Sequence, residues 1–385
     1  MINKIVNSKR LQILFKNHLY IITGVIVFLN ILVFQSWLVR FGNQFTIYNL
    51  IASSLRAVLV LFATWTVVID KKLNFQKLFP YAIFGNVALI NFATTGSNVL
   101  LVLFLFLFAI RNLEFNKIVS VFFVAQMMAA TFIVFFNRIG LLPSVIDNRG
   151  AQIRDSFGFS GSNIFSLLVS FIIIEGLYLS SNKKNNLKYI FSLVLSAIVY
   201  LITDTRTGFI ISLSAIILFF IAEKFSKNIF SFALALGSLS MMLFGLFLPT
   251  IYSSNIKLFA ALDSVLSGRL SFANQFLNLY ETRALGTRIF TVPNDQLTGS
   301  TLILDNFYIR NLLDSGWIFI LLFFAVTIYA IIFLYKNKFI NELIILFLCL
   351  LIGNFENTLT SISVCILFVI IYATVDSKKL SEGIK

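Results

Sequence analysis

The sequence is poor in charge and in the residues that build metal and disulfide sites. Only 12% of its 385 residues are charged, whereas a soluble globular domain averages about 25%. Its two cysteines, Cys349 and Cys365, lie in apolar stretches without the spacing of a metal knuckle or a redox pair. The single histidine, His18, lies in the approach to the first apolar run. We therefore expect no disulfide framework, no metal site and no cofactor.

Apolar residues dominate the chain instead. Hydrophobic residues make up 59% of it, with 45 phenylalanines, and apolar stretches recur along the whole length without a long polar insert. This composition predicts an integral membrane protein with one polytopic domain over residues 1–385. The net charge of +14 comes mostly from lysines in predicted cytoplasmic loops. We therefore expect a lipid bilayer as a partner, and no nucleic acid.

Twelve segments are apolar enough for membrane-spanning helices, each of which needs ~20 residues to cross ~30 Å of hydrocarbon. The expected fold class is an all-α polytopic bundle of about twelve transmembrane helices. An alternative for residues 78–110 is a re-entrant hairpin, because two short segments meet there at the uncharged Thr94–Asn98. The expected segments are 18–38, 47–69, 78–93, 96–110, 118–137, 163–180, 187–203, 207–222, 228–250, 315–335, 339–353 and 358–375.

Lysine and arginine fall on opposite sides of these segments. If the N-terminus is cytoplasmic, 17 of the 18 lysines lie inside and 9 of the 12 arginines lie outside. Positive charge in cytoplasmic loops sets orientation, so we expect both termini to be cytoplasmic and the outer arginines to serve a ligand. Two outer loops are long, residues 138–162 and the large loop 251–314, and function should concentrate there.

The first candidate constellation lies where the first long outer loop runs into a predicted helix. Glycines and serines that lead into a helix leave backbone N–H groups that favour an anion, as does the helix dipole. With Arg154 beside them, they predict a phosphate site. The alternative is structural: Ser160, Ser162 and Asn163 cap the helix, and Arg154 pairs with Asp155 or with lipid head groups.

The second constellation is the short turn Thr203–Gly208, between two predicted spans. Arg206 would present a planar bidentate fork to a phosphate, and Asp204 would orient that fork. Charged residues at span ends are costly unless they are used. The alternative is that Asp204 and Arg206 pair to close the turn, while Gly208 allows close approach of two helices.

The third constellation lies in the large loop, with Arg269 near its start, Arg288 in its middle and Asp305 near its end. The spacing of Asp305, Ile309 and Gly316 predicts an amphipathic helix at the membrane surface. Asp305 lacks an obvious partner within that helix, which makes it a candidate general base. Its alternative role is the N-cap of the helix.

Two further sets of charged residues have structural interpretations. Arg310 and Asp314, four residues apart, predict a salt bridge on that helix. Arg56 lies inside the second span, where a lipid-facing position penalises arginine by ~2.5 kcal/mol or more. We therefore expect Arg56 to face a cavity or a carboxylate, with Glu175 or Glu356 as the partner.

Five short motifs, in a fixed order over roughly residues 150–360, resemble the Wzy-type polymerases of O-antigen and capsular polysaccharide and the related O-antigen ligases. The motifs are Arg154–Asn163, Thr203–Gly208, Ser267–Arg269, Asp305–Tyr308 with Gly316, and Glu356–Asn357. The resemblance implies an inverting, metal-independent glycosyltransferase of the bacterial cytoplasmic (inner) membrane. It would join undecaprenyl-pyrophosphate-linked oligosaccharide repeat units, donor onto acceptor, on the outer face, beside a flippase and a chain-length regulator.

The resemblance also implies roles for individual residues. Asp305 and Arg206 are the catalytic candidates. The ligase branch has a histidine where Asp305 stands, which favours a polymerase; a ligase and a lipid-linked oligosaccharide flippase are the alternatives. The expected pyrophosphate-binding set is Arg154, Arg206, Arg269 and Arg288. The residues expected to shape the pocket are Asn163, Asp204, Gly208, Asn306, Tyr308 and Glu356.

Overall fold

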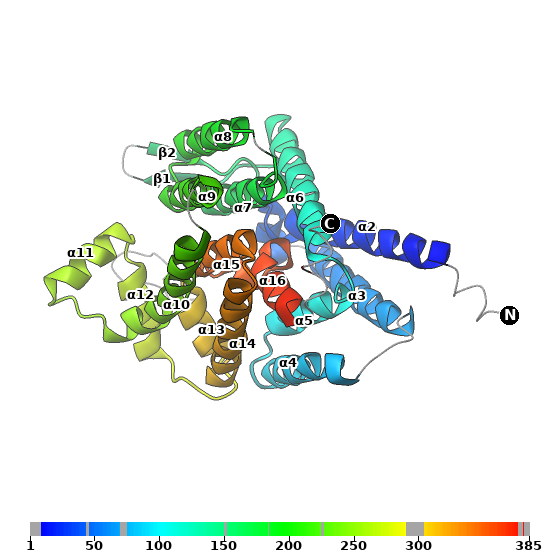
Figure 1. Ribbon diagram of the computed structural model, residues 1–385. Helices are drawn as coiled ribbons and strands as arrows, with labels where there is room; N and C mark the ends of the chain where they lie inside the picture. The colour runs from blue at the N-terminus through cyan, green and yellow to red at the C-terminus, as the bar shows by residue number, and fades with distance from the viewer. Residues whose placement is uncertain are drawn as a thin grey trace.

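The structure is a computed structural model that describes residues 9–43, 46–69, 75–149, 152–183, 185–224, 227–289, 304–375 and 380. Most of these residues are helical, and Figure 1 shows the helices packed around a central pair. The α-helices are α2 (Lys9–Phe34), α3 (Thr46–Ile69), α4 (Phe75–Thr95), α5 (Val99–Ala109), α6 (Phe115–Arg138), α7 (Ser162–Leu179), α8 (Leu187–Thr203), α9 (Arg206–Lys224), α10 (Lys227–Ile251), α11 (Lys257–Val265), α12 (Arg269–Leu279), α13 (Phe307–Asp314), α14 (Trp317–Lys336), α15 (Ile340–Ile352) and α16 (Ile366–Val375). The 3₁₀ helices are η1 (Trp37–Asn43), η2 (Thr358–Thr360) and η3 (Ile362–Val364).

Each of the twelve predicted segments contains a helix. In the described part of the chain, seven helices are long and apolar enough to cross a membrane, namely α2, α3, α6, α7, α9, α10 and α14. Large apolar side chains cover the outside: Phe191 is 70% exposed, Leu201 80% and Ile229 76%. Such a surface is stable only against lipid. The protein is thus an all-α, multi-pass membrane protein, and the crossing of all twelve segments stays a prediction.

Two short helices, α15 and α16, occupy the centre of the bundle (Figure 1). The 13 residues of α15 reach only about 20 Å, less than the ~30 Å hydrocarbon layer. Residues 353–365 follow without a continuous α-helix, and most of them are buried. Irregular backbone at membrane depth is tolerated only where protein or a cavity covers it. Packing of η2 and η3 against α5, and of η3 against α2, provides that cover.

A β-hairpin lies in the first long outer loop, where the sequence analysis predicted no strand. Strand β1 (Ile146–Arg149) pairs antiparallel with β2 (Gln152–Asp155). Beyond it, the isolated bridge between Ser36 and Phe159 ties the loop to the end of α2. The hairpin therefore holds the segment that leads into α7 against two neighbouring helices.

The amphipathic surface helix predicted from Asp305 to Gly316 is wrong in extent and position. Helix α13 begins at Phe307, and Phe307, Tyr308 and Ile309 are completely buried. Its polar residues face protein groups, since Asn306 Nδ2 donates to the carbonyl of Gly245 at 3.0 Å. The i, i+4 spacing of apolar residues marks the face of α13 that packs against other parts of the protein. A helix that lies on a bilayer has the same spacing, so the sequence pattern does not separate the two cases.

The predicted Arg310–Asp314 salt bridge is also absent. Both residues lie in the described part of the chain and form no ion pair within 4.0 Å there. The carboxylate of Asp314 instead accepts a hydrogen bond from Ser97 Oγ at 3.2 Å. This bond fixes the end of α13 to the connection between α4 and α5.

Glycine permits two close contacts between elements that carry the predicted motifs. A Cβ on Gly208 of α9 would lie 2.0 Å from Ser166 Oγ, and 3.0 Å from the Cβ and the carbonyl oxygen of Ser166, on α7. A Cβ on Gly245 of α10 would lie 2.0 Å from the ring of Tyr308. These contacts match the structural interpretation of Gly208, in which the glycine lets α9 approach α7 closely.

Gly208→Ala should lower the free energy of unfolding by ~1–3 kcal/mol. The hydroxyl of Ser166 can rotate away from the new methyl group, but its Cβ and backbone cannot. Thermal unfolding in detergent measures the effect. Gly161→Ala is the control, because a Cβ at Gly161 meets no atom within 4 Å. Equal melting temperatures for the two variants would contradict this account of α7–α9 packing.

Candidate active site

Arg269, Glu356 and Asp305 converge from three parts of the chain. The guanidinium of Arg269 donates through Nε to the carbonyl of Phe355 at 2.9 Å and through Nη2 to Glu356 Oε1 at 3.4 Å. Asp305 Oδ2 lies 3.7 Å from the same Nη2. The side chains are 14%, 9% and 25% exposed for Arg269, Glu356 and Asp305. One cation thus faces two carboxyl groups in a largely desolvated place.

Arg269 is held at the first residue of α12 by the turn before it. Ser267 and Gly268 have φ angles of 58° and 82°, in the left-handed region that glycine adopts readily. Asp263 Oδ1 then accepts the backbone N–H groups of Leu270 at 2.9 Å and Ser271 at 3.1 Å. Asp263 therefore caps α12 and fixes the direction of the Arg269 side chain.

Asp305 is held by hydrogen bonds on either side of it. Asn357 Nδ2 donates to the carbonyl of Leu304 at 2.7 Å, and the N–H of Phe307 donates to the carbonyl of Gly353 at 2.9 Å. Both bonds join the Asp305 segment to the irregular backbone after α15. That backbone also carries Glu356, so the two carboxyl groups are positioned by the same contacts.

The N-cap alternative for Asp305 is wrong, because its neighbour has that role. Asn306 Oδ1 accepts the backbone N–H of Ile309 at 2.9 Å. Tyr308, predicted to shape the pocket, is completely buried and donates to the carbonyl of Leu350 at 2.9 Å. Asn306 and Tyr308 thus hold the backbone next to Asp305 in place. The carboxylate of Asp305 is not used as a helix cap and lies near Arg269.

The electrostatics of the cluster favour one retained proton. Burial raises the pKa of Asp305, and the nearby Arg269 opposes that change. Burial, and next the Asp305 carboxylate, raise the pKa of Glu356 to about 8, again against Arg269. Two carboxyl groups near one cation titrate as a pair. The pair therefore retains one proton at neutral pH, and Glu356, with 9% of its side chain exposed against 25% for Asp305, is the candidate to hold it.

The predicted phosphate ligand Arg154 is 8% exposed and contacts protein oxygens. Its Nε donates to the carbonyl of Thr203 at 3.0 Å, and its Nη2 donates to Asn163 Oδ1 at 2.7 Å. Neither Asp155 nor a lipid head group is needed to explain these contacts. Arg154 joins β2, the start of α7 and the end of α8, and Asn163 is its acceptor.

Arg206 follows the turn that Arg154 contacts and, in contrast to Arg154, is exposed. It is the first residue of α9, after the left-handed Asp204 with φ of 46°. The hydroxyls of Thr203 and Thr205 lie 2.6 Å apart within the turn. Arg154 therefore positions the turn, and the turn presents Arg206.

The contacts given above fall into two groups of residues: Arg154 bonds to Thr203 and Asn163, and Arg269 bonds to Phe355 and Glu356 and lies near Asp305. They are connected through helix packing, since α9 packs against α15, which leads to Glu356. Arg288 is exposed, next to Thr287, whose N–H donates to the carbonyl of Leu313 at 2.7 Å.

The expectation for Arg56 is wrong. Arg56 is exposed, and its guanidinium lies 5.8 Å from the centre of the Phe34 ring. Glu175 is fully buried and accepts from Gln126 Nε2 at 3.1 Å, while Glu356 contacts Arg269. A charge inside a helix is tolerated on its outer side when an aromatic face and the long side chain lessen the cost.

Sequence reasoning did not recognise two contributions to the site. Glu356 was expected to shape a pocket, and its role as the proton-holding partner of Asp305 depends on a contact across 51 residues. Asp263 was not singled out, because it lies within α11, six residues before the start of α12, and reaches the N–H groups of α12 only through the turn between the two helices.

Comparisons with protein-family models, with curated proteins and with solved structures give no match. The class that the fold defines is a polytopic α-helical membrane protein with a buried arginine–dicarboxyl cluster. The relationship to polysaccharide polymerases stays a prediction from the sequence motifs.

Glu356→Gln tests the buried proton through stability. A pKa raised from 4.5 to about 8 on folding stabilises the fold fully below pH 4.5, and this contribution is lost as pH rises to about 8. Glutamine has no such loss. The melting temperature of Glu356→Gln minus that of wild type should therefore increase from about pH 5 to about pH 9. The control is Glu281→Gln, at a side chain 83% exposed; a flat difference for Glu356→Gln would contradict the assignment.

Proposed function

We propose that this protein is a polysaccharide polymerase, a glycosyltransferase that joins undecaprenyl-pyrophosphate-linked repeat units on the outer face of the bacterial inner membrane. The observation that supports it best is the Arg269–Glu356–Asp305 cluster. It combines a carboxylate able to accept a proton with a cation in a place of low dielectric. The order of motifs along the chain and the exposed Arg206 add support.

In the proposed reaction an acceptor hydroxyl attacks the anomeric carbon of the donor sugar with inversion. The new C–O bond forms as the bond from that carbon to the pyrophosphate oxygen breaks, and the lipid pyrophosphate leaves with the bonding pair. The hydroxyl proton passes to Asp305, which is more exposed than Glu356, 25% against 9%. Glu356 keeps its proton and, with Arg269, holds Asp305 in place.

Charge on the leaving pyrophosphate has to be stabilised for this transfer to proceed. Fixed guanidinium groups supply that stabilisation without reorganising during the reaction. Arg206 is the candidate, because it is exposed at the start of α9 and Arg154 fixes the turn that carries it. Alignment of the acceptor hydroxyl contributes further, since positioning alone is worth ~7 kcal/mol or more.

Asp305→Asn should reduce chain extension about 10²–10⁴-fold, the usual contribution of a general base. Asparagine keeps the size of the side chain and its oxygen near Arg269, so the fold should remain. The measurement is glycan chain length in cells that carry the variant in place of the native protein. Normal chain lengths at normal protein levels would rule out Asp305 as the base.

Arg206→Lys should keep the protein in the membrane and reduce polymerisation about 10²–10³-fold, because lysine lacks the planar fork. Single repeat units should still reach the cell surface. Arg283→Lys is the matched control, since Arg283 is exposed and lies 3.4 Å from Glu281. A variant that accumulates long polymer on the lipid carrier indicates a ligase, and one that blocks movement of single repeats indicates a flippase.

A further inference from the structure

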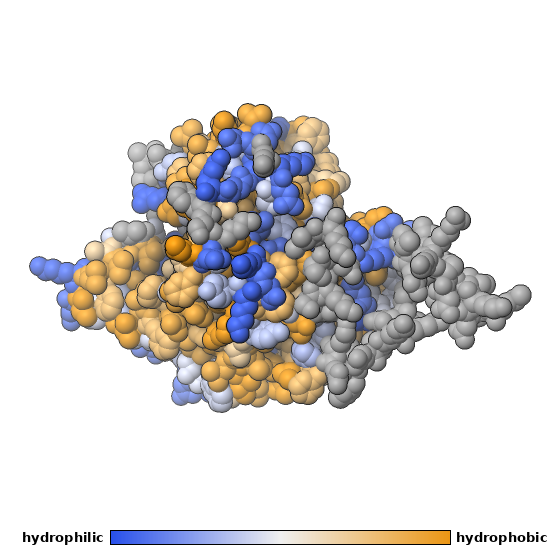
Figure 2. All heavy atoms as spheres, viewed as in Figure 1, coloured by the Kyte–Doolittle hydropathy of each residue, from blue (hydrophilic) through white to orange (hydrophobic). Residues whose placement is uncertain are grey.

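A large polar cavity lies at the other end of the bundle from Arg269. Its volume is about 1090 Å³, and it is lined by the ends of α7, α9 and α14 and the beginnings of α6, α8 and α15. These helix ends adjoin the connections that the sequence analysis placed in the cytoplasm. Figure 2 shows hydrophilic side chains gathered over α7, α8 and α9 within a largely apolar surface. The volume exceeds the ~300–1,000 Å³ of most small-ligand pockets.

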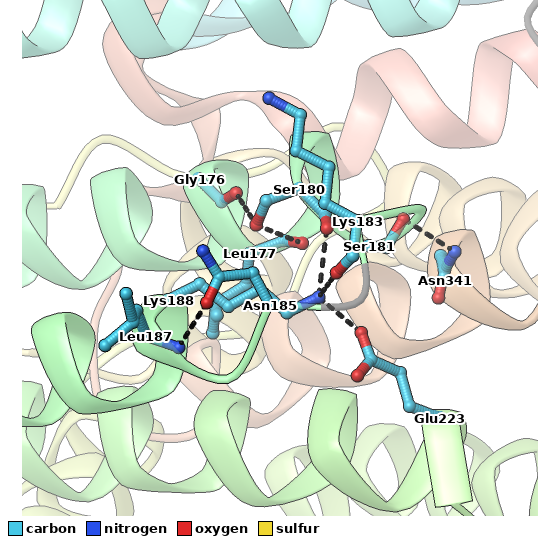
Figure 3. A network of polar contacts seen from close by, with 10 residues as sticks. All are labelled: Gly176, Leu177, Ser180, Ser181, Lys183, Asn185, Leu187, Lys188, Glu223 and Asn341. Carbon is cyan, nitrogen blue, oxygen red and sulfur yellow. Dashed lines mark hydrogen bonds and ion pairs between the residues drawn. The ribbon is translucent and has the colours of Figure 1, made fainter.

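A network of hydrogen bonds shapes one wall of the cavity (Figure 3). Lys188 Nζ donates to the carbonyls of Ser180 at 2.9 Å and Lys183 at 3.0 Å, and it also pairs with Glu223. Asn341 Nδ2 reaches Ser181 Oγ at 3.1 Å from the opposite wall. Lys188 thus neutralises the charge of Glu223, and all three N–H donors of its ammonium group bond to protein oxygens.

The acidic side chain deeper in the cavity is also engaged. Glu342 is 8% exposed, and the Tyr178 hydroxyl donates to its Oε1 at 2.8 Å. The same hydroxyl contacts the side chain of Asn116. The polar side chains Glu223, Asn341 and Glu342 of the lining therefore all bond to other groups of the protein.

Three lysines of the lining, Lys183, Lys224 and Lys338, are exposed and make no ion pair within the described residues. Lys224 Nζ lies 5.9 Å from the centre of the Phe220 ring, a contact that leaves its N–H donors for a ligand. In Figure 3 the ammonium group of Lys183 points away from the residues that its backbone contacts. The side-chain amides of Asn182, Asn186 and Asn341 lie on the same lining. The cavity therefore presents exposed cations beside a hydrogen-bonded polar wall.

We propose that this cavity binds a phosphate-bearing ligand from the lysine-rich side of the membrane. Ammonium groups bind phosphate as point charges, and amide groups bond to the remaining phosphate oxygens or to neighbouring hydroxyls. Basic pockets between transmembrane helices on the cytoplasmic side favour anionic head groups. The phosphate comes from an anionic lipid or from a soluble compound, and the two sources are separated by experiment.

The cavity is distinct from the proposed active site. Helix α15 begins at the cavity with Ile340 and ends at Ile352, just before the segment that carries Glu356. Its 13 residues separate the two places by about 20 Å. Binding here does not depend on the proposed polymerase reaction.

Thermal unfolding of the purified full-length protein in a neutral detergent tests the proposal with two probes. One arm compares sodium phosphate with sodium chloride at equal ionic strength. The other compares micelles that contain phosphatidylglycerol with micelles that contain phosphatidylcholine. Lys183→Gln/Lys224→Gln should bind the active probe at least about tenfold more weakly than wild type, because two charge-assisted contacts are lost.

The matched control is Lys257→Gln/Lys336→Gln, which removes the same charge from exposed lysines outside the lining. It should respond like wild type. Stabilisation by phosphate identifies a soluble ligand, and stabilisation by phosphatidylglycerol alone identifies a lipid head group. An equal response of the cavity variant and wild type, or no response of wild type to either probe, overturns the proposal.

Discussion

The contact of Arg269 with Glu356 and Asp305 is the interaction on which the arrangement of α12, α13 and the backbone after α15 depends. A buried guanidinium beside two carboxyl groups is stable only if its geometry is good and the remaining polar atoms have partners. The carbonyl of Phe355 takes Nε, and Asp263 holds the start of α12. The irregular backbone between α15 and α16 supplies the carbonyl of Phe355 and the side chain of Glu356, which both accept from Arg269. The interruption of the central helices therefore provides the acceptors that the buried guanidinium needs.

The same break positions α13. Phe307 donates to Gly353 and Tyr308 to Leu350, while Gly245 leaves room for the Tyr308 ring. A helix that lay on the bilayer would leave Asp305 in solvent, with an ordinary carboxyl pKa. Packed inside the protein, it brings Asp305 near Glu356 and Arg269. Burial is thus what raises the pKa values of both carboxyl groups.

The sequence predicted what depends on local composition. Apolar length located a helix in each of the twelve segments, and the charged residues in the connections between them picked out Arg206, Arg269 and Asp305. It could not predict contacts between distant segments. The acceptors of Arg154, a carbonyl 49 residues away and the side chain of Asn163, and the burial of α13 depend on how the loops fold over the helices. The i, i+4 pattern of α13 did not show how deeply the helix is buried, because periodicity does not distinguish lipid from protein. The expectation for Arg56 came from the cost of a charge inside a span, and the structure places Arg56 on the exposed side of its helix.

The central claim, that the Arg269 cluster performs chemistry beyond its structural role, is tested most directly by the double variant Arg269→Gln/Asp305→Asn. This variant removes the cation and the carboxylate together, and the remaining Glu356 holds a proton, so no unpaired buried charge is left and the account predicts that thermal stability returns close to wild type. It also predicts that glycan chain extension in proteoliposomes stays lost. Restored stability together with restored chain extension would contradict the account, because the cluster would then be only structural.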